Sequence, residues 1–286
     1  DENDGSCTNG DCSLRDAIQV AASGDTITIN EIGTIQLASG SPELSISKSL
    51  TINGPGADKL TVSANDIASG ATYTRRVFSI TAGSYVVIND LTIANGHLEG
   101  KKGAGIYNDG YLTLNNVIVT NNMIFLSLYV GHAKGGGIYN DGSLTMNGGA
   151  VTDNSADYGA GIYSSSNSIL MLNDVVISDN TIDPFGTSTD AGEGGGVYAE
   201  SSVNFQIINS AIVNNSAKKD GGGIYSEASL MLTDSLVADN TVTDFDGGGL
   251  YLDGSGNTYT LTNVTVSGNS ANMNAGGILL YQGDLS

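Results

Sequence analysis

Apolar residues recur at fixed places in a series of short segments between about residues 85 and 280. Each segment contains two apolar residues separated by one other residue, as in Leu112 and Leu114, and a second such pair follows a few residues later. Side chains alternate along a β-strand, so the two apolar residues of each pair point to the same side. Together with an aliphatic residue in a preceding glycine-rich phrase, the pattern predicts three short strands per segment, separated by turns.

The glycine-rich phrase reads Gly-(Gly/Ala)-Gly-(Ile/Val/Leu)-Tyr and occurs six times, with its tyrosine at Tyr107, Tyr139, Tyr163, Tyr198, Tyr225 and Tyr251. A frayed seventh copy runs from Ala275 to Leu279. Periods of about 20–50 residues are typical of solenoids. The sequence therefore predicts an all-β, right-handed, single-stranded parallel β-helix with three short strands per coil. Successive coils would stack about 4.8 Å apart around a continuous apolar core.

An asparagine follows the third strand of six coils, at Asn122, Asn154, Asn180, Asn215, Asn240 and Asn269, and Gly96 takes the same place one coil earlier. Stacked asparagines can exchange side-chain amide hydrogen bonds, and asparagine tolerates the left-handed backbone conformation. We expect a structural ladder rather than a binding site.

The tyrosines of the glycine phrase directly follow an inward-pointing aliphatic residue, so they are expected to point outward as an exposed column. Two interpretations remain open. The rings pack between neighbouring coils, or they form a sugar-stacking or adhesive stripe.

Residues 1–100 are less regular. A short amphipathic helix is expected at Asp16–Ala22, where it would cover the open end of the first coil. Strands are expected at Thr26–Ile29, Ile35–Leu37, Leu44–Ile46, Leu50–Ile52, Leu60–Val62 and Val77–Ile80. We expect one domain over residues 1–286, with a cap and first strand at 1–30, irregular coils at 31–100 and regular coils at 101–286. No capping segment follows the last glycine phrase, which indicates a fragment of a longer protein or a coil that docks end to end.

The net charge is −20, with only ten Lys and Arg residues. Such a surface disfavours nucleic acid and anionic lipid, and no apolar stretch is long enough for membrane insertion as a helix. The acidity serves solubility or, in part, cation binding. Cys7 and Cys12 are the only cysteines. A small disulfide loop, which indicates an oxidising extracytoplasmic compartment, is preferred over two free thiols.

Two stretches resemble known families. Cys12–Ala17, with the strand at Gly24–Ile27, resembles the CSLREA-type segment that often begins secreted β-helical surface proteins, although Asp16 stands where that segment usually has Glu. The glycine phrases, with Val151–Ala156 and Ile212–Ala217, are similar to the repeats of chlamydial polymorphic outer-membrane proteins, although Val or Ile replaces their Phe. Both resemblances imply an extracellular right-handed parallel β-helix of the kind found in adhesins, and neither implies a catalytic residue.

The sequence contains no recognisable catalytic motif. Basic residues are scattered or paired at turns, as in Arg75-Arg76, and are expected to be solvated. Acidic residues precede three glycine phrases, at Glu193, Asp220 and Asp246, and Asp244 with Asp246 is the best candidate for a cation site within one turn. We expect no cofactor, with Ca²⁺ at these aspartates as a weak alternative.

The spacing between the asparagine and the next tyrosine is longer in two coils, and it predicts loops at Met123–Lys134 and Thr181–Glu193 on one edge. Insertions in solenoids often form the binding face. The candidate interaction residues are Phe125, Leu128, Tyr129, Pro184 and Phe185. The first loop either folds back on the coils or presents a contact patch.

These observations favour a non-enzymatic, secreted or cell-surface β-helix that acts as an adhesin, a stalk or a self-assembling fibre subunit. Its expected partner is a second copy of the chain, head to tail, or a cell-surface or glycan ligand. The alternative is a carbohydrate-active enzyme such as a polysaccharide lyase or glycoside hydrolase, because parallel β-helices also host these activities.

Overall fold

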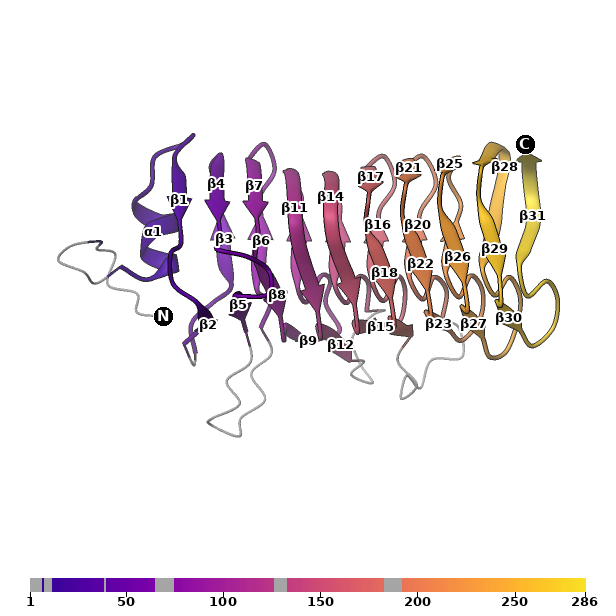
Figure 1. Cartoon of the computed structure of the whole chain (residues 1–286), viewed down its shortest axis with the longest axis horizontal. Helices are drawn as coiled ribbons and strands as arrows, with labels where there is room; N and C mark the ends of the chain where they lie inside the picture. Colours follow the sequence, from indigo (N-terminus) through magenta and orange to yellow (C-terminus); the bar gives the residue numbers. More distant parts are fainter. Residues whose placement is uncertain (1–6, 8–11, 39, 65–74, 126–132, 183–191) are drawn as a thin grey trace.

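The chain forms a rod of stacked coils in a computed structural model that describes residues 7, 12–38, 40–64, 75–125, 133–182 and 192–286. The first strand, β1 (Thr26–Thr28), and the last strand, β31 (Ile278–Leu285), lie at opposite ends of the rod (Figure 1). Strands of successive coils pair in parallel and in register, for example Ile106 with Ile138 and Leu144 with Leu170. The expected parallel β-helix is confirmed.

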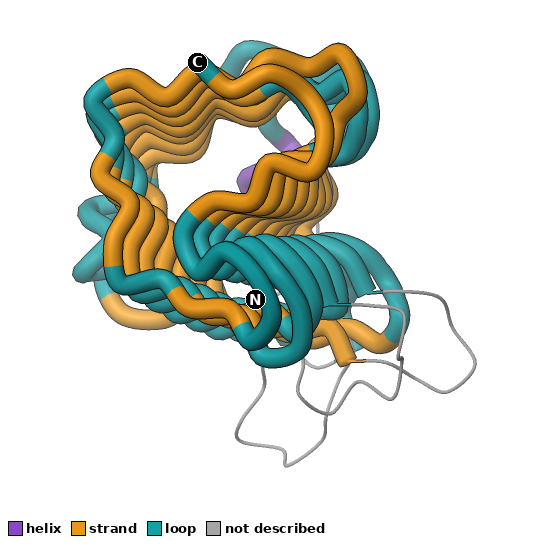
Figure 2. Tube along the Cα trace, turned by 90° about the vertical axis from the view of Figure 1, so that its right-hand side faces the viewer, coloured by secondary structure: helices purple, strands orange, loops and turns teal. Residues whose placement is uncertain are grey.

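Each coil contributes strands to several columns that run along the rod (Figure 2). The first column holds the strands of the glycine phrase and their counterparts: β3 (Leu44–Ile46), β6 (Phe78–Ile80), β10 (Ile106–Asn108), β13 (Ile138–Asn140), β16 (Ile162–Ser164), β20 (Val197–Ala199), β24 (Ile224–Ser226) and the starts of β28 (Leu250–Thr262) and β31 (Ile278–Leu285). The second column holds β1 (Thr26–Thr28), β4 (Leu50–Asn53), β7 (Tyr85–Asn89), the starts of β11 (Tyr111–Thr120) and β14 (Ser143–Thr152), β17 (Ile169–Asn173), β21 (Asn204–Ile208), β25 (Leu230–Thr233) and the end of β28.

The third column holds β2 (Gly33–Gln36), β5 (Leu60–Ser63), β8 (Thr92–Ala94), the ends of β11 and β14, β18 (Val176–Ser178), β22 (Ala211–Val213), β26 (Leu236–Ala238) and β29 (Thr265–Ser267). A shorter fourth column, which the sequence pattern did not suggest, follows the asparagine position: β9 (His97–Glu99), β12 (Met123–Phe125), β15 (Ser155–Ala156), β19 (Thr181–Ile182), β23 (Ser216–Ala217), β27 (Thr241–Val242) and β30 (Ser270–Ala271).

The core is one continuous apolar column inside the coils. In a typical coil Ile138, Leu144 and Val151 point inward from the first three strand columns and are fully buried. The same positions are buried from coil to coil, and the cluster extends from Leu14 in the first helix to Tyr259 in β28. Each such side chain contributes about 1.5–3 kcal/mol on burial, so the repeated columns are the main source of stability.

The six asparagines form a ladder along one corner, buried from Asn122 to Asn240 and half-buried at Asn269. The side-chain oxygen of Asn180 accepts from both the backbone N–H (3.1 Å) and the side-chain amide (3.0 Å) of Asn154, and the same pattern repeats along the ladder. The left-handed backbone conformation, however, belongs to the residue before each asparagine, such as Asp179 with φ of 57°. The ladder asparagines therefore occur for their amide groups, and their left-handed tolerance is not used.

Glycine is required at this corner because the next coil lies directly against it. Gly135 has a φ of +67°, and a Cβ at Gly137 would lie 2.6 Å from the carbonyl oxygen of Gly161 and 3.0 Å from the side chain of Asn154. The first glycine of the phrase thus makes the turn, and the third leaves room for the asparagine ladder.

A short helix, α1 (Leu14–Val20), lies beside β1 at the N-terminal end of the rod (Figure 1). It begins and ends two residues earlier than the sequence indicated, because the Ser13 hydroxyl caps it by accepting from the backbone N–H of Asp16 at 3.2 Å. The amine of Lys48 donates to the carbonyls of Gln19 and Ala21 near its other end. Leu14 and Ile18 are buried in the main core, so the helix covers the first coil.

Candidate functional site

The tyrosines of the glycine phrase form a stack along the outside of the first strand column. Each tyrosine pairs in register with the next, and the ring centroids from Tyr107 to Tyr251 lie 4.7–5.4 Å apart. Tyr281 continues the stack at 6.2 Å from Tyr251. The prediction of an exposed column is wrong for the central rings, since Tyr139, Tyr163 and Tyr198 are only 3%, 1% and 9% exposed. They point away from the core but are covered by each other and by flanking side chains.

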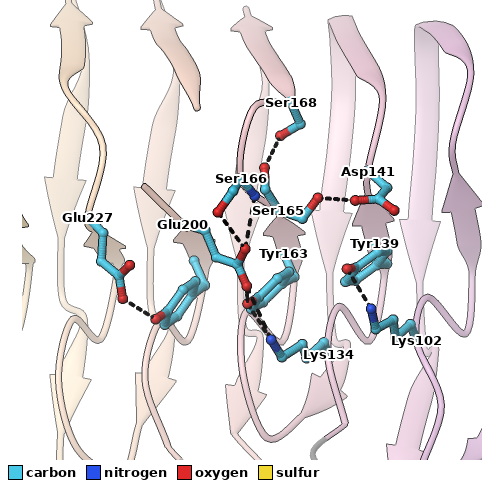
Figure 3. A network of polar contacts seen from close by, with 11 residues as sticks. Lys102, Lys134, Tyr139, Asp141, Tyr163, Ser165, Ser166, Ser168, Glu200 and Glu227 are labelled. Atoms are coloured by element: carbon cyan, nitrogen blue, oxygen red, sulfur yellow. Dashed lines mark hydrogen bonds and ion pairs between the residues drawn. The ribbon is translucent and has the colours of Figure 1, made fainter. Parts of the chain in front are cut away.

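A basic column flanks the N-terminal half of the tyrosine stack. The amine of Lys102 donates to the Tyr139 hydroxyl at 2.8 Å and lies 4.4 Å from that ring's centroid. Lys134 repeats the arrangement one coil later, donating to the Tyr163 hydroxyl at 2.6 Å. Each lysine reaches forward to the tyrosine of the following coil (Figure 3), so these cation–π contacts join successive coils.

Carboxylates approach the tyrosine hydroxyls from the other side. Glu200 accepts from the hydroxyl of Tyr163, from the backbone N–H and hydroxyl of Ser166 at 2.9 Å each, and pairs with Lys134 at 3.2 Å (Figure 3). Burial alone would raise the pKa of Glu200, but these hydrogen bonds and the charge of Lys134 outweigh it and lower the pKa to about 2. Burial, and then the bond to Glu200, raises the pKa of Tyr163. At physiological pH the Glu200 carboxylate is therefore ionised and the Tyr163 phenol is neutral.

The charge of the side chains that flank the tyrosine stack changes from positive to negative along the rod. The residue five positions before each stacked tyrosine is Lys102, Lys134, Tyr158, Glu193, Asp220 and Asp246 in successive coils. Burial raises the pKa of Glu193 to about 7, despite Lys219 at 3.9 Å. Burial also raises the pKa of Asp220. The C-terminal half of the edge is therefore acidic on both sides of the tyrosines, because Glu227 and Asp253 lie on the other flank.

A groove of about 640 Å³ opens beside this acidic half. Its lining comes from three successive turns and the last coil: Ser201, Ser202, Val203, Asn204, Glu227, Ser229, Asp253, Gly254, Ser255, Asn257 and Gln282. Glu227 connects it to the stack, because its carboxylate accepts from the Tyr198 hydroxyl at 2.7 Å. The groove is lined mainly by polar residues.

Arg75 and Arg76 differ from the expectation of solvated turn charges. Arg75 is 5% exposed and donates to the backbone carbonyls of Leu37 and Ser41, at 2.9 and 3.0 Å. Arg76 pairs with Glu43 at 2.9 Å and lies over the ring of Tyr107. Arg75 thus ties early coils to one another, and Arg76 ties an early coil to the regular ones. Their position at a turn does not reveal these roles.

The two predicted loops are shorter than the spacing indicated. Met123–Phe125 is strand β12, with Ile124 fully buried and Phe125 against the His97 ring at 4.8 Å, and Thr181–Ile182 is strand β19. These residues belong to the fourth strand column. Leu128, Tyr129, Pro184 and Phe185 lie outside the described residues, so their role as interaction residues stays a prediction.

The candidate cation pair has other contacts. The carboxylate of Asp220 accepts from the backbone N–H of Asp246 at 3.1 Å, and Asp246 in turn accepts from the backbone N–H of Asn274. The backbone N–H of Asp244 donates to the carbonyl of Lys218. Over the ranges that the structure describes, no three His, Cys, Asp or Glu side chains form a metal-binding group. A calcium site at Asp244 and Asp246 stays a prediction. At the N-terminus, Cys7 and Cys12 are joined by a disulfide.

Sequence reasoning missed both the tyrosine network and the groove. Two constant offsets could have revealed the network, since the flanking side chains occur five residues before and two residues after each tyrosine. The groove could have been found from the turn between the tyrosine and the next strand, because the length of that turn also varies from coil to coil.

Comparison with known proteins supports the repeat assignment. The family model of the Chlamydia polymorphic membrane protein repeat matches residues 209–227, which run from the turn before β22 through β24. No curated protein and no solved structure matches the chain. Among the described residues, no helix is both long and apolar enough to cross a membrane. The fold and the repeat thus define a parallel β-helix whose matched repeat is that of a surface-protein family, which fits a non-enzymatic surface protein.

Proposed function

We propose that this chain is the rigid, non-enzymatic part of a secreted or cell-surface protein, an adhesin or stalk that holds a recognition surface. The observation that supports this best is the continuous polar and aromatic stack on the outside of the coils. From Tyr107 to Tyr281 the centroid of each ring lies no more than 6.2 Å from that of the next ring. The asparagine ladder also runs from coil to coil. Both stacks link each coil to the next by side-chain contacts along the length of the rod.

Several of the residues that could serve acid–base chemistry are bound to one another within this stack. Lys134, Tyr163 and Glu200 are bound to one another, and Tyr198 is bound to Glu227. A general base must be free to take a proton from a substrate. Their mutual bonds favour a structural role.

Attachment to cells or glycan-coated surfaces tests the proposal. The fluorescently labelled chain is expected to bind saturably, and unlabelled chain should compete. A variant in which residues 126–132 and 183–191 are shortened tests the predicted loops, with Asp109→Asn as a matched surface control. Absence of saturable binding by the intact chain to every cell type and glycan surface would contradict the adhesin role.

Two alternatives have direct tests. Depolymerisation of acidic or neutral polysaccharides, with and without Ca²⁺, would identify an enzyme. End-to-end fibres seen by electron microscopy of the purified chain would support the fibre-subunit prediction instead.

A further inference from the structure

The groove beside the acidic half of the tyrosine edge arises from unequal turns. Four residues separate Tyr225 from Leu230, whereas six separate Tyr198 from Phe205 and seven separate Tyr251 from Tyr259. The strands that follow these turns are in register, with Phe205 beside Leu230 and Leu230 beside Tyr259. A short turn is therefore held between two long ones, and its residues form the floor of the groove. The volume of about 640 Å³ is within the range of small-ligand sites, about 300–1,000 Å³.

The lining is suited to a ligand rich in hydroxyl groups. The lining includes two carboxylates, Glu227 and Asp253, and three side-chain amides, those of Asn204, Asn257 and Gln282. Four serine hydroxyls complete the polar set: Ser201, Ser202, Ser229 and Ser255. These groups can both donate and accept hydrogen bonds. The only large apolar side chain in the lining, Val203, is itself 5% exposed, so an apolar ligand would find little to contact.

The floor is held in place before any ligand arrives. One oxygen of Glu227 accepts from the Tyr198 hydroxyl, and the Asn257 amide donates to the Glu227 backbone carbonyl at 2.5 Å. The Ser229 hydroxyl accepts from the backbone N–H of Thr258 at 3.1 Å, which joins the floor to one wall. The second carboxylate oxygen of Glu227 has no hydrogen-bond partner among the described residues. Preorganised groups lose little entropy on binding.

Charge restricts the class of saccharide. No described cation lies within ion-pair distance of Glu227 or Asp253, unlike Glu200 with its Lys134 and Glu193 with its Lys219. The whole chain carries a net charge of −20. Acidic sugars would be repelled, and protonated amino groups would be attracted.

A second depression, which contains apolar side chains, continues the groove onto the neighbouring face of the sheet. This smaller depression of about 200 Å³ shares Val203, Asn204 and Ser229 with the groove and adds Met231, which is 45% exposed. The C–H face of a sugar ring can pack against such a side chain while its hydroxyls reach the polar turns.

We propose that this groove binds a short oligosaccharide whose sugars are uncharged or carry protonated amino groups. The proposal rests on the adhesin function above and names its ligand class. Asp253 and Glu227 would accept from hydroxyl or ammonium groups, and Met231 would support the next sugar ring.

Titration calorimetry of the full chain tests the site with four probes: oligomers of glucosamine, oligomers of N-acetylglucosamine, oligogalacturonate and oligolysine. We expect binding of one or both of the first two and none of oligogalacturonate. Asp253→Asn should weaken glucosamine-oligomer binding about tenfold, as expected for the loss of one charge interaction of about 1.4 kcal/mol. Asp141→Asn, in the same turn column outside the groove, should leave it unchanged.

Several results would overturn the proposal: binding of oligolysine alone, preference for oligogalacturonate, no saccharide binding at millimolar concentration, or equal binding by the Asp253→Asn variant. If Asp253→Asn still attaches to cells like the intact chain while no saccharide binds the groove, the ligand assignment fails and the adhesin function stands. If the intact chain does not attach to cells while the groove still binds sugar, the adhesin function fails and the ligand assignment stands.

Discussion

Two glutamates on the tyrosine edge differ in how they respond to pH, although both are partly buried. Glu200 lies among donors and a lysine, whereas Glu193 has a lysine at 3.9 Å and acidic neighbours. The balance between burial and partners sets the sign of each pKa shift. Each glutamate therefore gives a separate stability prediction.

Glu193 should make the protein less stable as the pH rises. Its pKa is raised from 4.5 to about 7, so the folded chain holds a proton that the unfolded chain releases between these values. The stabilising contribution is complete below about pH 4.5 and is lost as the pH rises through about 7. Thermal unfolding at about pH 5 and about pH 8 should show a smaller difference in melting temperature for Glu193→Gln than for the natural chain. An equal difference would show that Glu193 is ionised in the folded state throughout.

Glu200 should make the protein less stable as the pH falls, the opposite of Glu193. Its pKa is lowered to about 2, so its contribution is present above about pH 4.5 and is lost as the pH falls toward 2. Glu200→Gln should therefore destabilise the fold at neutral pH, by about 1–3 kcal/mol because a charge-assisted bond set is lost. Denaturant unfolding at pH 7 and in acid measures this, and Asp109→Asn serves as a control on an exposed carboxylate. A variant whose stability matches the natural chain at pH 7 would contradict the network's role.

At the scale of elements, substitution of an asparagine in the buried ladder should destabilise the fold far more than substitution of an asparagine outside it. Asn180→Ala removes the acceptor for two groups of Asn154 and the donor to the Val151 carbonyl, all buried. Unsatisfied buried groups cost about 1–3 kcal/mol each, so a loss of about 3–5 kcal/mol is expected. Asn147→Ala is the matched control, because Asn147 is half-buried and makes one amide bond, to Asn115. Its loss should stay below about 1 kcal/mol in urea unfolding, and similar losses for the two variants would show that the ladder has no special weight.

The strand columns could be predicted from sequence because each inward position repeats. Leu112, Leu144 and Leu170 occupy one register position in successive coils, so a single rule places them all. The asparagine column was recognisable for the same reason. Repetition turns a weak local preference into a strong pattern.

The burial of the tyrosines could not be predicted from strand alternation alone. Alternation correctly places Tyr163 outside the core, but the ring is covered by the neighbouring tyrosines and by Lys134 and Glu200, which come from other coils. The groove could not be predicted for a similar reason, because it depends on the length of the turn at Glu227 relative to the turns of the coils on either side. Features that depend on differences between coils are averaged out when repeats are aligned.

At the scale of the whole molecule, the net charge of −20 should make stability depend on salt. Charges at the acidic end of the tyrosine edge repel one another, and added salt reduces the screening length from about 10 Å at 0.1 M to about 3 Å at 1 M. The melting temperature should therefore rise with NaCl concentration. CaCl₂ at matched ionic strength should raise it by no more than NaCl, because Asp220 and Asp246 already accept from backbone N–H groups. A larger rise with calcium that disappears in Asp246→Asn, but persists in Asp109→Asn, would instead establish the calcium site at Asp244 and Asp246.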